Sequence, residues 1–177
     1  SLCAYLLEYG FTHVEFMPIF KSSHESSWGY HTTGFFAPSS RYGTPDDLKY
    51  LINLMHKNDI GVIFDWVPAY FSKDEGGLHL FDGSPLFEPQ NESAAGLSQE
   101  GVLRFDFSKE LTCDFLISNA LYWYSEFHID GLNISTVSSM IHPNIGLDSI
   151  DNSAIEFIRL LNTQVRERFP YALMIAE

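Results

Sequence analysis

The sequence is short of basic residues, and this shortage excludes a class of partner. Only 10 Lys and Arg stand against 23 Asp and Glu, which gives a formal net charge of −13. A protein without a basic patch cannot neutralise the phosphates of a nucleic acid or of an anionic membrane. We therefore expect no nucleic-acid and no membrane partner, whereas a neutral polysaccharide or another protein stays compatible with the charge.

Cysteine and long apolar runs are also scarce. Cys3 and Cys113 are the only cysteines, and we interpret them as free thiols in a reducing compartment because their spacing fits no metal site. No charged-then-apolar leader and no run of about 18 apolar residues occurs. The seven histidines contain no close pair of ligands. These observations predict a cytoplasmic protein with no metal and no cofactor.

What is present is a globular composition. The 177 residues are 45% hydrophobic and include 15 Phe, enough for one domain with its own core. The aromatic side chains suit core packing, and sugar-stacking surfaces are the alternative.

Apolar runs and capping signals alternate along the chain. Four runs are predicted to be strands, at residues 13–19, 61–67, 128–135 and 172–177, and the first two are expected to be buried. Helices are predicted over residues 2–9, from Thr44, from Ser108 as a cap, and over 151–169 with Ile155, Ile158 and Val165 facing inward. Residues 21–42 and 68–107, and the segment with Pro143 and Gly146, are predicted loops.

The helix after Thr44 has the clearest start signal. Thr44 is a good N-cap, Pro45 suits the first helical position, and Asp46 and Asp47 favour the positive end of the helix dipole. A helix is therefore expected to begin at Pro45.

Strands separated by helices predict βαβ units and a parallel sheet. The long loops follow strands, as in a (β/α)-barrel, whose functional face lies at the carboxyl ends of the strands. A doubly wound open sheet is the alternative, but no Gly-rich phosphate loop follows any strand. We predict an α/β fold that forms part of a (β/α)8 TIM barrel.

Three strand ends carry polar residues that can support chemistry. Asp65 ends one predicted strand, Asn133 and Ser135 end the next, and Glu177 ends the last. Side chains alternate along a strand, so Asn133 and Ser135 face the same way, and in a barrel the three ends converge. Two converging carboxylates suit glycoside chemistry. In the alternative interpretation Asp65 binds the loop that follows it and Glu177 is simply solvated.

An aromatic loop follows the first strand, in the stretch WGYHTTGFFAP that begins at Trp28. Aromatic faces pack against sugar rings, and Gly29 would allow close approach. The alternative is a loop packed on its own aromatic side chains. Ser135 lacks the G-x-S-x-G pattern of a nucleophile, so we interpret its hydroxyl as structural.

Taken together, these stretches resemble the α-amylase superfamily and, within it, the glycogen (1,4-α-glucan) branching enzymes. The matching pieces are GFTHVEFMPI, SWGYHTTGFFAPSSRYGTPDDLKYLI, GVIFDWVPAYF, LHLFDGSPLFE, SNALYWYSEFHIDGL, VSSMI and MIAE, in family order over nearly the whole chain. The resemblance implies retaining transglycosylation, which moves an α-1,4 glucan onto a 6-hydroxyl through a glycosyl ester on an Asp. By position, Glu177 matches the acid/base, Tyr30 the aromatic of the sugar-binding loop and Asp65 the Asp of the first motif.

The same comparison reveals departures at the reacting centre. Ser135 stands where the family has its nucleophilic Asp, and Asn133 stands where the family has the Arg that orients it. Tyr70 replaces the sugar-binding His and follows Ala69 in place of a Gly. We therefore expect no branching activity from this chain.

The resemblance covers about half of a barrel, roughly strands 2 to 5, and residues 1–177 are expected to form one segment. N-terminal modules, the late strands and a C-terminal β-domain are absent from it, and the start at Ser1 rather than Met suggests a piece of a longer chain. Half a barrel leaves strand edges open, so a homodimer through those edges is one expectation. Two non-catalytic alternatives are an α-glucan-binding module that stacks sugars on Trp28, Tyr30 and Trp66, and a regulatory pseudoenzyme.

Overall fold

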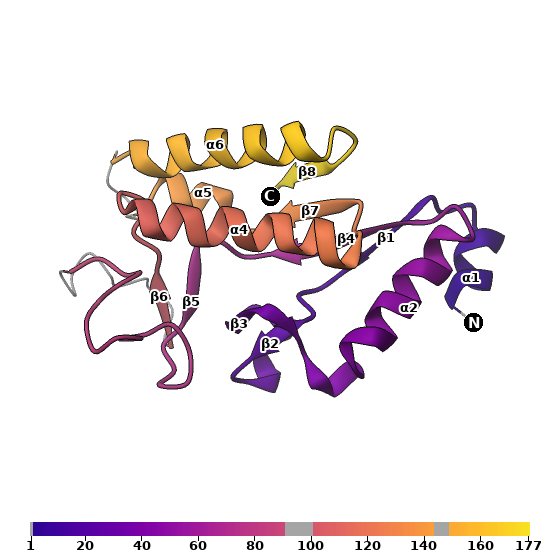
Figure 1. The fold of residues 1–177 in the computed structure, drawn as a ribbon, viewed down its shortest axis with the longest axis horizontal. Helices are drawn as coiled ribbons and strands as arrows, with labels where there is room; N and C mark the ends of the chain where they lie inside the picture. The colour runs from indigo at the N-terminus through magenta and orange to yellow at the C-terminus, as the bar shows by residue number, and fades with distance from the viewer. Residues whose placement is uncertain (1, 91–100, 144–148) are drawn as a thin grey trace.

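A parallel four-stranded sheet forms the centre of the computed structural model, which describes residues 2–90, 101–143 and 149–177 (Figure 1). The strand order is β1 (His13–Phe16), β4 (Gly61–Trp66), β7 (Gly131–Ile134) and β8 (Leu173–Ala176). All three neighbouring pairs are parallel. The predicted α/β fold with a parallel sheet is therefore confirmed.

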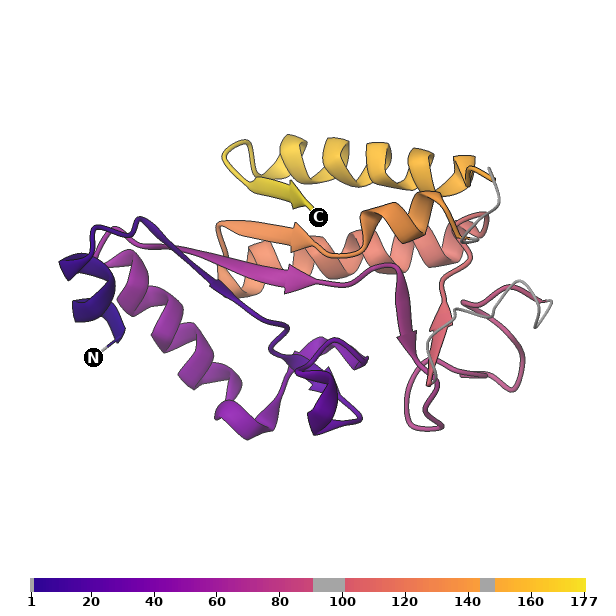
Figure 2. The same ribbon diagram turned by 180° about the vertical axis from the view of Figure 1, so that it is seen from behind.

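Helices connect the strands. They are α1 (Leu2–Glu8), α2 (Pro45–His56), α4 (Glu110–Phe127), α5 (Val137–Ile141) and α6 (Asn152–Arg168). In Figure 1, α4 crosses in front of the sheet, and Figure 2 shows it behind the sheet from the opposite side. None of the helices in the described ranges is long and apolar enough to cross a membrane.

The start of α2 follows the sequence signal. The Thr44 side chain accepts a hydrogen bond from the Asp47 backbone N–H, and the Asp47 carboxylate accepts one from the Thr44 backbone. This reciprocal capping box satisfies two backbone donors that have no partner inside the helix. The hydrogen bonds from Thr44 also hold the pKa of Asp47 below its usual value.

The predicted cap of α4 was one residue too early. Lys109 is the N-cap and makes no side-chain cap bond. The Ser108 hydroxyl and backbone N–H instead donate to the Asp106 carboxylate, at 2.6 Å and 3.1 Å. Ser108 therefore stabilises the turn before the helix rather than the helix itself.

The long loops contain short antiparallel strands that the sequence analysis missed. β2 (Phe20–Ser22) pairs with β3 (Thr32–Pro38), and β5 (Tyr70–Ser72) pairs with β6 (Val102–Arg104). Short 3₁₀ turns occur at Glu25–Ser27 and Ser40–Tyr42. β2, β5 and β6 have three residues each, too few for a periodic signal, and register shifts interrupt the pairing of β2 with the seven-residue β3. Gly146 and residues 91–100 lie outside the described ranges.

The edge strand β1 is more exposed than predicted, and the other edge strand, β8, is exposed as well. β1 alternates exposed and half-buried residues, and β8 is mostly exposed, whereas every residue of β7 is buried. The run at residues 13–19 was expected to be a buried strand, and this prediction was wrong for β1. Each edge strand has a neighbour on one side only within the described chain, so its apolar residues are incompletely covered.

The inward face of α6 also differs from expectation. Val165 is buried as predicted, but Ile155 and Ile158 are only half buried. The buried positions are Ala154, Phe157, Leu161 and Val165, which repeat at helical spacing. The helix predicted over residues 151–169 is observed as Asn152–Arg168, and the Asp151 carboxylate caps it by accepting from the backbone N–H groups of Ser153 and Ala154.

Candidate functional site at the carboxyl ends of the strands

Asp65 and Asn133 lie side by side at the carboxyl end of the sheet. They are register partners on β4 and β7, and the Asn133 amide Nδ2 donates to Asp65 Oδ1 at 3.2 Å. Asp65 is 5% exposed and Asn133 is 6% exposed. The structure therefore brings together two of the strand ends that the sequence analysis singled out.

Tyr30 binds the second carboxylate oxygen of Asp65. The Tyr30 hydroxyl donates to Asp65 Oδ2 at 2.6 Å. Tyr30 belongs to the loop that follows β2, so Asp65 binds a distant loop and not the loop directly after its own strand. Burial and the neighbouring Asp65 carboxylate raise the pKa of the Tyr30 hydroxyl, so the phenol stays protonated and acts as a donor.

Glu15 is a member of the site that the sequence analysis missed. Asn133 Nδ2 donates to Glu15 Oε1 at 3.0 Å, so one amide bridges two carboxylates. The hydrogen bond that Glu15 shares with Asp65, followed by partial loss of solvent around this exposed residue, raises the pKa of Glu15 above its usual value. An isolated carboxylate in the apolar run HVEFMPI was the available signal. We call Glu15, Tyr30, Asp65 and Asn133 the acidic network.

Ser135 lies on the same face of the chain, two residues beyond Asn133. Its backbone N–H donates to the Trp66 carbonyl at 3.0 Å, which extends the strand ladder. The residue is 5% exposed, and its hydroxyl has no hydrogen-bond partner in the described part of the protein. No side-chain base therefore contacts the hydroxyl to activate it as a nucleophile.

Glu177 reaches the same edge of the sheet. Its backbone N–H donates to the Ile134 carbonyl at 3.1 Å, and its carbonyl accepts from the Val137 N–H at 3.0 Å. The Glu177 charge contributes to the raised pKa values of Glu15 and Tyr30. The Glu177 charge is thus felt by the acidic network at the other two strand ends. Among the described contacts, no side-chain hydrogen bond joins Glu177 to that network.

Two predicted sugar-stacking aromatics are placed differently by the structure. Trp66 is fully buried, and its indole N–H donates to Asn119 Oδ1 at 2.8 Å. It is therefore a core residue, and the prediction that it offers a stacking surface was wrong. Trp28 is 69% exposed and lines an apolar groove of about 430 Å³ beside Met17, Tyr42 and Leu48. No member of the acidic network lines that groove.

The Trp28–Gly29 turn is shaped by the protein itself. Gly29 has φ of +93°, and a Cβ there would lie 2.0 Å from the Pro18 carbonyl oxygen. The close approach expected at Gly29 is therefore to the backbone of Pro18. Only glycine fits both this contact and this dihedral.

Tyr70, at the position of the family's sugar-binding His, lies in β5 and is 8% exposed. Its ring meets that of His31 edge to face, with centroids 6.4 Å apart. Burial raises the pKa of the Tyr70 hydroxyl. The side chain is therefore packed among its neighbours, with little surface left for a ligand.

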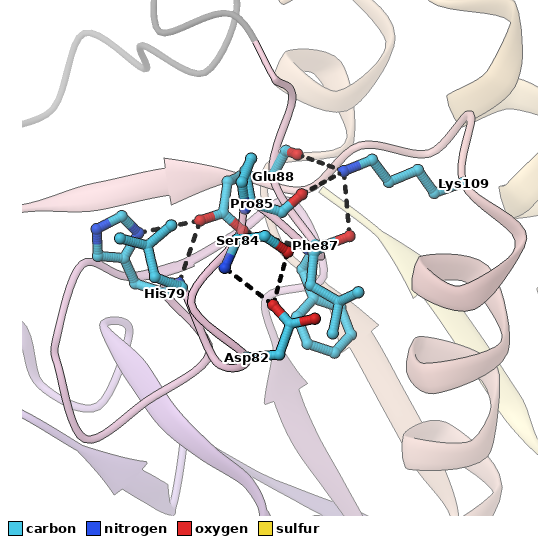
Figure 3. Close-up of polar contacts among 9 residues, drawn as sticks. His79, Asp82, Ser84, Pro85, Phe87, Glu88 and Lys109 are labelled. Atoms are coloured by element: carbon cyan, nitrogen blue, oxygen red, sulfur yellow. Dashed lines mark hydrogen bonds and ion pairs between the residues drawn. The ribbon is translucent and has the colours of Figure 1, made fainter.

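Beside the strand ends, the loop between β5 and β6 is fastened by one lysine (Figure 3). Lys109 Nζ donates to the carbonyls of Pro85, Leu86 and Glu88, at 2.7, 3.1 and 2.7 Å. The Glu88 carboxylate, 3% exposed, pairs with His79 Nδ1 at 3.0 Å. Figure 2 shows β5, β6 and the described part of the loop after β5, residues 73–90, extending beyond the carboxyl end of β4.

Comparison with known proteins agrees with this geometry. The family model for the alpha amylase catalytic domain matches residues 2–82. A 1,4-alpha-glucan branching enzyme of Streptomyces avermitilis is 42% identical over all of this chain and 32% of its own length. The enzyme of Fusobacterium nucleatum is 44% identical over 99% of this chain and 28% of its own length, and that of Bacillus subtilis is 41% identical. The chain thus spans about a third or less of these relatives.

Solved structures show the same fold. A Salmonella typhimurium structure assigned to the alpha amylases superposes with a TM-score of 0.77 and 27% identity, over 98% of this chain and 27% of that one. A maltogenic alpha-amylase of Thermotoga neapolitana superposes with a TM-score of 0.75 at 20% identity, over 98% of this chain and 39% of that one, and so shows the fold alone. The chain belongs to the 1,4-alpha-glucan branching enzymes of the α-amylase superfamily and corresponds to part of their catalytic (β/α)8 barrel.

Proposed function

We propose that this chain presents an α-glucan-binding face of the branching-enzyme type and does not itself carry out the transglycosylation. The observation that supports the proposal is that Asp65 keeps its hydrogen-bond donors at the strand ends, whereas the position of the nucleophile holds only a hydroxyl. Asp65 keeps two side-chain donors, Tyr30 and Asn133, while Ser135 offers a buried hydroxyl with no partner in the described chain.

The chemistry of retaining glycosyl transfer explains why the lack of a carboxylate at position 135 should abolish turnover. Retaining transfer needs one carboxylate to form the glycosyl ester and a second group to protonate the leaving oxygen. Glu177 can supply the proton, but Ser135 has neither a negative charge nor a neighbouring base. Loss of a nucleophile within a coupled catalytic set costs on the order of 10⁴–10⁶ in rate.

The binding part of the proposal rests on the retained polar groups. Asp65 and Glu15 can accept hydrogen bonds from sugar hydroxyls, and these groups are held by Asn133 rather than left to rotate. In the resemblance to the family, Asn133 and Ser135 replace an Arg and an Asp, so the paired change leaves the local net charge unaltered. A neutral polysaccharide is also compatible with the net charge of −13.

Branch formation on amylose tests the loss of chemistry. We expect the wild-type chain to form no α-1,6 branches above a Glu177→Gln control. Branching above that control would overturn the proposal. The double variant Asn133→Arg/Ser135→Asp, made in the same chain and assayed in parallel, tests whether these two side chains are the cause, and any gain of activity would support their assignment.

Calorimetric titration with maltoheptaose tests the binding. We expect saturable heat from the wild type and a weaker affinity for Tyr30→Phe, with Tyr50→Phe as the matched control. Tyr50 is 66% exposed and lies on α2, away from the strand ends. Equal affinity of wild type and Tyr30→Phe, or no binding at all, would contradict a glucan-binding role for this face.

Association with an active branching enzyme is the second candidate function. The open edges of β1 and β8, together with the apolar groove at Trp28, favour it, because such surfaces promote association with another chain. A cytoplasmic location would suit either role, since both described cysteines are free thiols. A chain that binds no maltoheptaose but co-sediments with an active branching enzyme would favour this candidate.

A further inference from the structure

A tight turn leads the chain into the acidic network. The Tyr30 backbone N–H donates to the Ser27 carbonyl at 2.9 Å, so residues 27–30 form a hydrogen-bonded β-turn. The two central residues, Trp28 and Gly29, both have positive φ, of 51° and 93°. Positive φ at both central positions is the signature of a type I′ turn. The chain therefore reverses its direction directly before Tyr30.

The turn is strained at its first central residue. Positive φ is an outlier for a side chain as bulky as Trp28, and turns of this type favour Gly, Asn and Asp. The Trp28 side chain is 69% exposed, so packing in the core does not hold the residue in this conformation. A strained backbone persists only where its surroundings fix it, and such residues cluster at ligand sites. The contacts of Gly29 fix this turn.

Gly29 is held on two sides. A Cβ on Gly29 would lie 2.0 Å from the Pro18 carbonyl oxygen, so its Cα lies directly against the backbone that follows β1. Its own carbonyl accepts a hydrogen bond from the Thr32 hydroxyl at 3.4 Å, and Thr32 is a 1%-exposed residue at the start of β3. The turn is thereby fixed relative to the strands on either side of it.

The bond that Tyr30 makes depends on this placement. The Tyr30 hydroxyl lies 2.6 Å from Asp65 Oδ2. Since a Cβ contact below 3.0 Å is essentially never seen, a methyl group on Gly29 would have to move away from the Pro18 oxygen by about 1 Å. A shift of that size at the hydroxyl would take the bond outside the usual range of about 2.5–3.0 Å. Asp65 would then keep Asn133 as its side-chain donor within the described chain.

We propose that Gly29 is the positioning residue for Tyr30 in glucan binding. Because Gly29 has no side chain, the turn can lie against the Pro18 carbonyl, and the Tyr30 phenol then reaches Asp65. This inference rests on the proposed glucan-binding role of the strand ends. Gly29 acts through Tyr30 and does not contact the sugar. Substitution of Gly29 and removal of the Tyr30 hydroxyl should therefore have the same consequence, and their effects should not add.

Calorimetric titration of the full chain with maltoheptaose tests this proposal. We expect Gly29→Ala and Tyr30→Phe each to weaken the affinity by about fivefold to tenfold, the effect of losing one well-made hydrogen bond. The double variant should bind no more weakly than Tyr30→Phe alone, because the hydroxyl is already displaced. Gly10→Ala is the matched control. Gly10 also has positive φ, of 73°, but a Cβ there meets nothing within 4 Å, so binding should be unchanged.

Three results would overturn the positioning role. They are an unchanged affinity in Gly29→Ala, a double variant whose loss is the product of the two single losses, and an equal loss in Gly10→Ala, which would assign the effect to backbone strain alone. Trp28→Asn separates the two side chains of the turn, because Asn tolerates positive φ and removes the indole. A loss in Trp28→Asn as large as that in Gly29→Ala would assign the effect to the indole instead.

Urea unfolding of the same proteins tests the coupling without any sugar. If the wild type does not bind maltoheptaose, the proposed function fails, while the link between Gly29 and Tyr30 is still measured. We expect Tyr30→Phe to lower the midpoint in the wild-type background and to have little effect in the Gly29→Ala background. An equal drop in both backgrounds would contradict the link.

Thr32→Val is the milder variant if circular dichroism shows that Gly29→Ala does not fold. It removes only the hydroxyl that holds the Gly29 carbonyl. We expect it to weaken maltoheptaose binding, and to lower the urea midpoint further, when Tyr30 is present than when Tyr30 is replaced by Phe. Equal effects in both backgrounds would show that the turn does not act through Tyr30.

Discussion

The Tyr30 hydroxyl donates to Asp65 Oδ2 at 2.6 Å and so joins the aromatic loop to the end of a central strand. The two residues are 35 positions apart in the sequence. The bond matters because Asp65 is buried, and its second oxygen is held by Asn133. A buried carboxylate with both oxygens bound is a fixed acceptor, which is what a ligand-binding face requires.

Tyr30→Phe should therefore destabilise the protein. The change removes a hydrogen bond to a charged acceptor, and such bonds contribute about 1.5–3 kcal/mol. Urea unfolding should show a lower midpoint with an unchanged slope. A midpoint equal to that of the Tyr50→Phe control would show that Asp65 is satisfied without Tyr30.

Glu15 should make stability depend on pH in a defined direction. Its pKa is raised above the usual 4.5 in the folded state, first by the hydrogen bond shared with Asp65 and then by partial desolvation. Between pH 4.5 and the raised value the folded state holds more protons than the unfolded state, so this contribution to stability falls as pH rises.

The difference in Tm between wild type and Glu15→Gln isolates this contribution, because the other acids are common to both. We expect the wild type to lose Tm relative to Glu15→Gln as pH rises from 4.5 to 8. A difference that stays constant over this range, or one of opposite sign, would contradict the raised pKa.

Asn119 should be the most sensitive polar residue of the core. It is fully buried, accepts from the Trp66 indole at 2.8 Å and donates to the Phe35 carbonyl at 2.6 Å. Asn119→Ala leaves the indole N–H unpaired and opens a cavity, at a cost of about 2–4 kcal/mol. Asn162→Ala, which removes a less buried bond to the Ile158 carbonyl, is the control for unfolding in urea. Similar losses in both variants would refute the importance of burial.

Lys109 should hold the loop between β5 and β6 in place. Its ammonium group satisfies the carbonyls of Pro85, Leu86 and Glu88 (Figure 3). Lys109→Met should keep the aliphatic packing but release the loop, which limited proteolysis would detect as faster cleavage at residues 78–88. Lys49→Met is the control, because Lys49 pairs with Glu126 on the exposed surface at 3.9 Å. Unchanged cleavage in Lys109→Met would show that the loop is held by other contacts.

The open edges of the sheet should make the chain self-associate. β1 and β8 each have one described neighbour, and unpaired strand edges are templates for another chain. Sedimentation at increasing concentration should therefore show a homodimer, weakened by Val14→Lys on β1. A monomer at high micromolar concentration would contradict this expectation, and Glu156→Lys on α6 controls for added charge.

Local signals predicted much of the scaffold. The apolar runs at β4, β7 and β8 and the N-cap signal of Thr44 and Pro45 were sufficient to predict the parallel sheet and α2, because both depend on short-range patterning. The antiparallel pairs β2–β3 and β5–β6 escaped prediction because loops separate their strands in the sequence and their pairing depends on tertiary contacts. The edge character of β1 likewise depends on what neighbours it.

The sequence by itself determined the family, the identity of the residues at each strand end, and the absence of an Asp at position 135 and an Arg at position 133. Only the tertiary structure decided that Asn133 bridges Glu15 and Asp65, that Trp66 is core rather than surface, and that Ser135 Oγ is buried without a described partner. The reason is physical. Which segments form strands depends on local patterns of apolar residues. The partner of a buried polar atom depends on segments that meet only after the chain has folded.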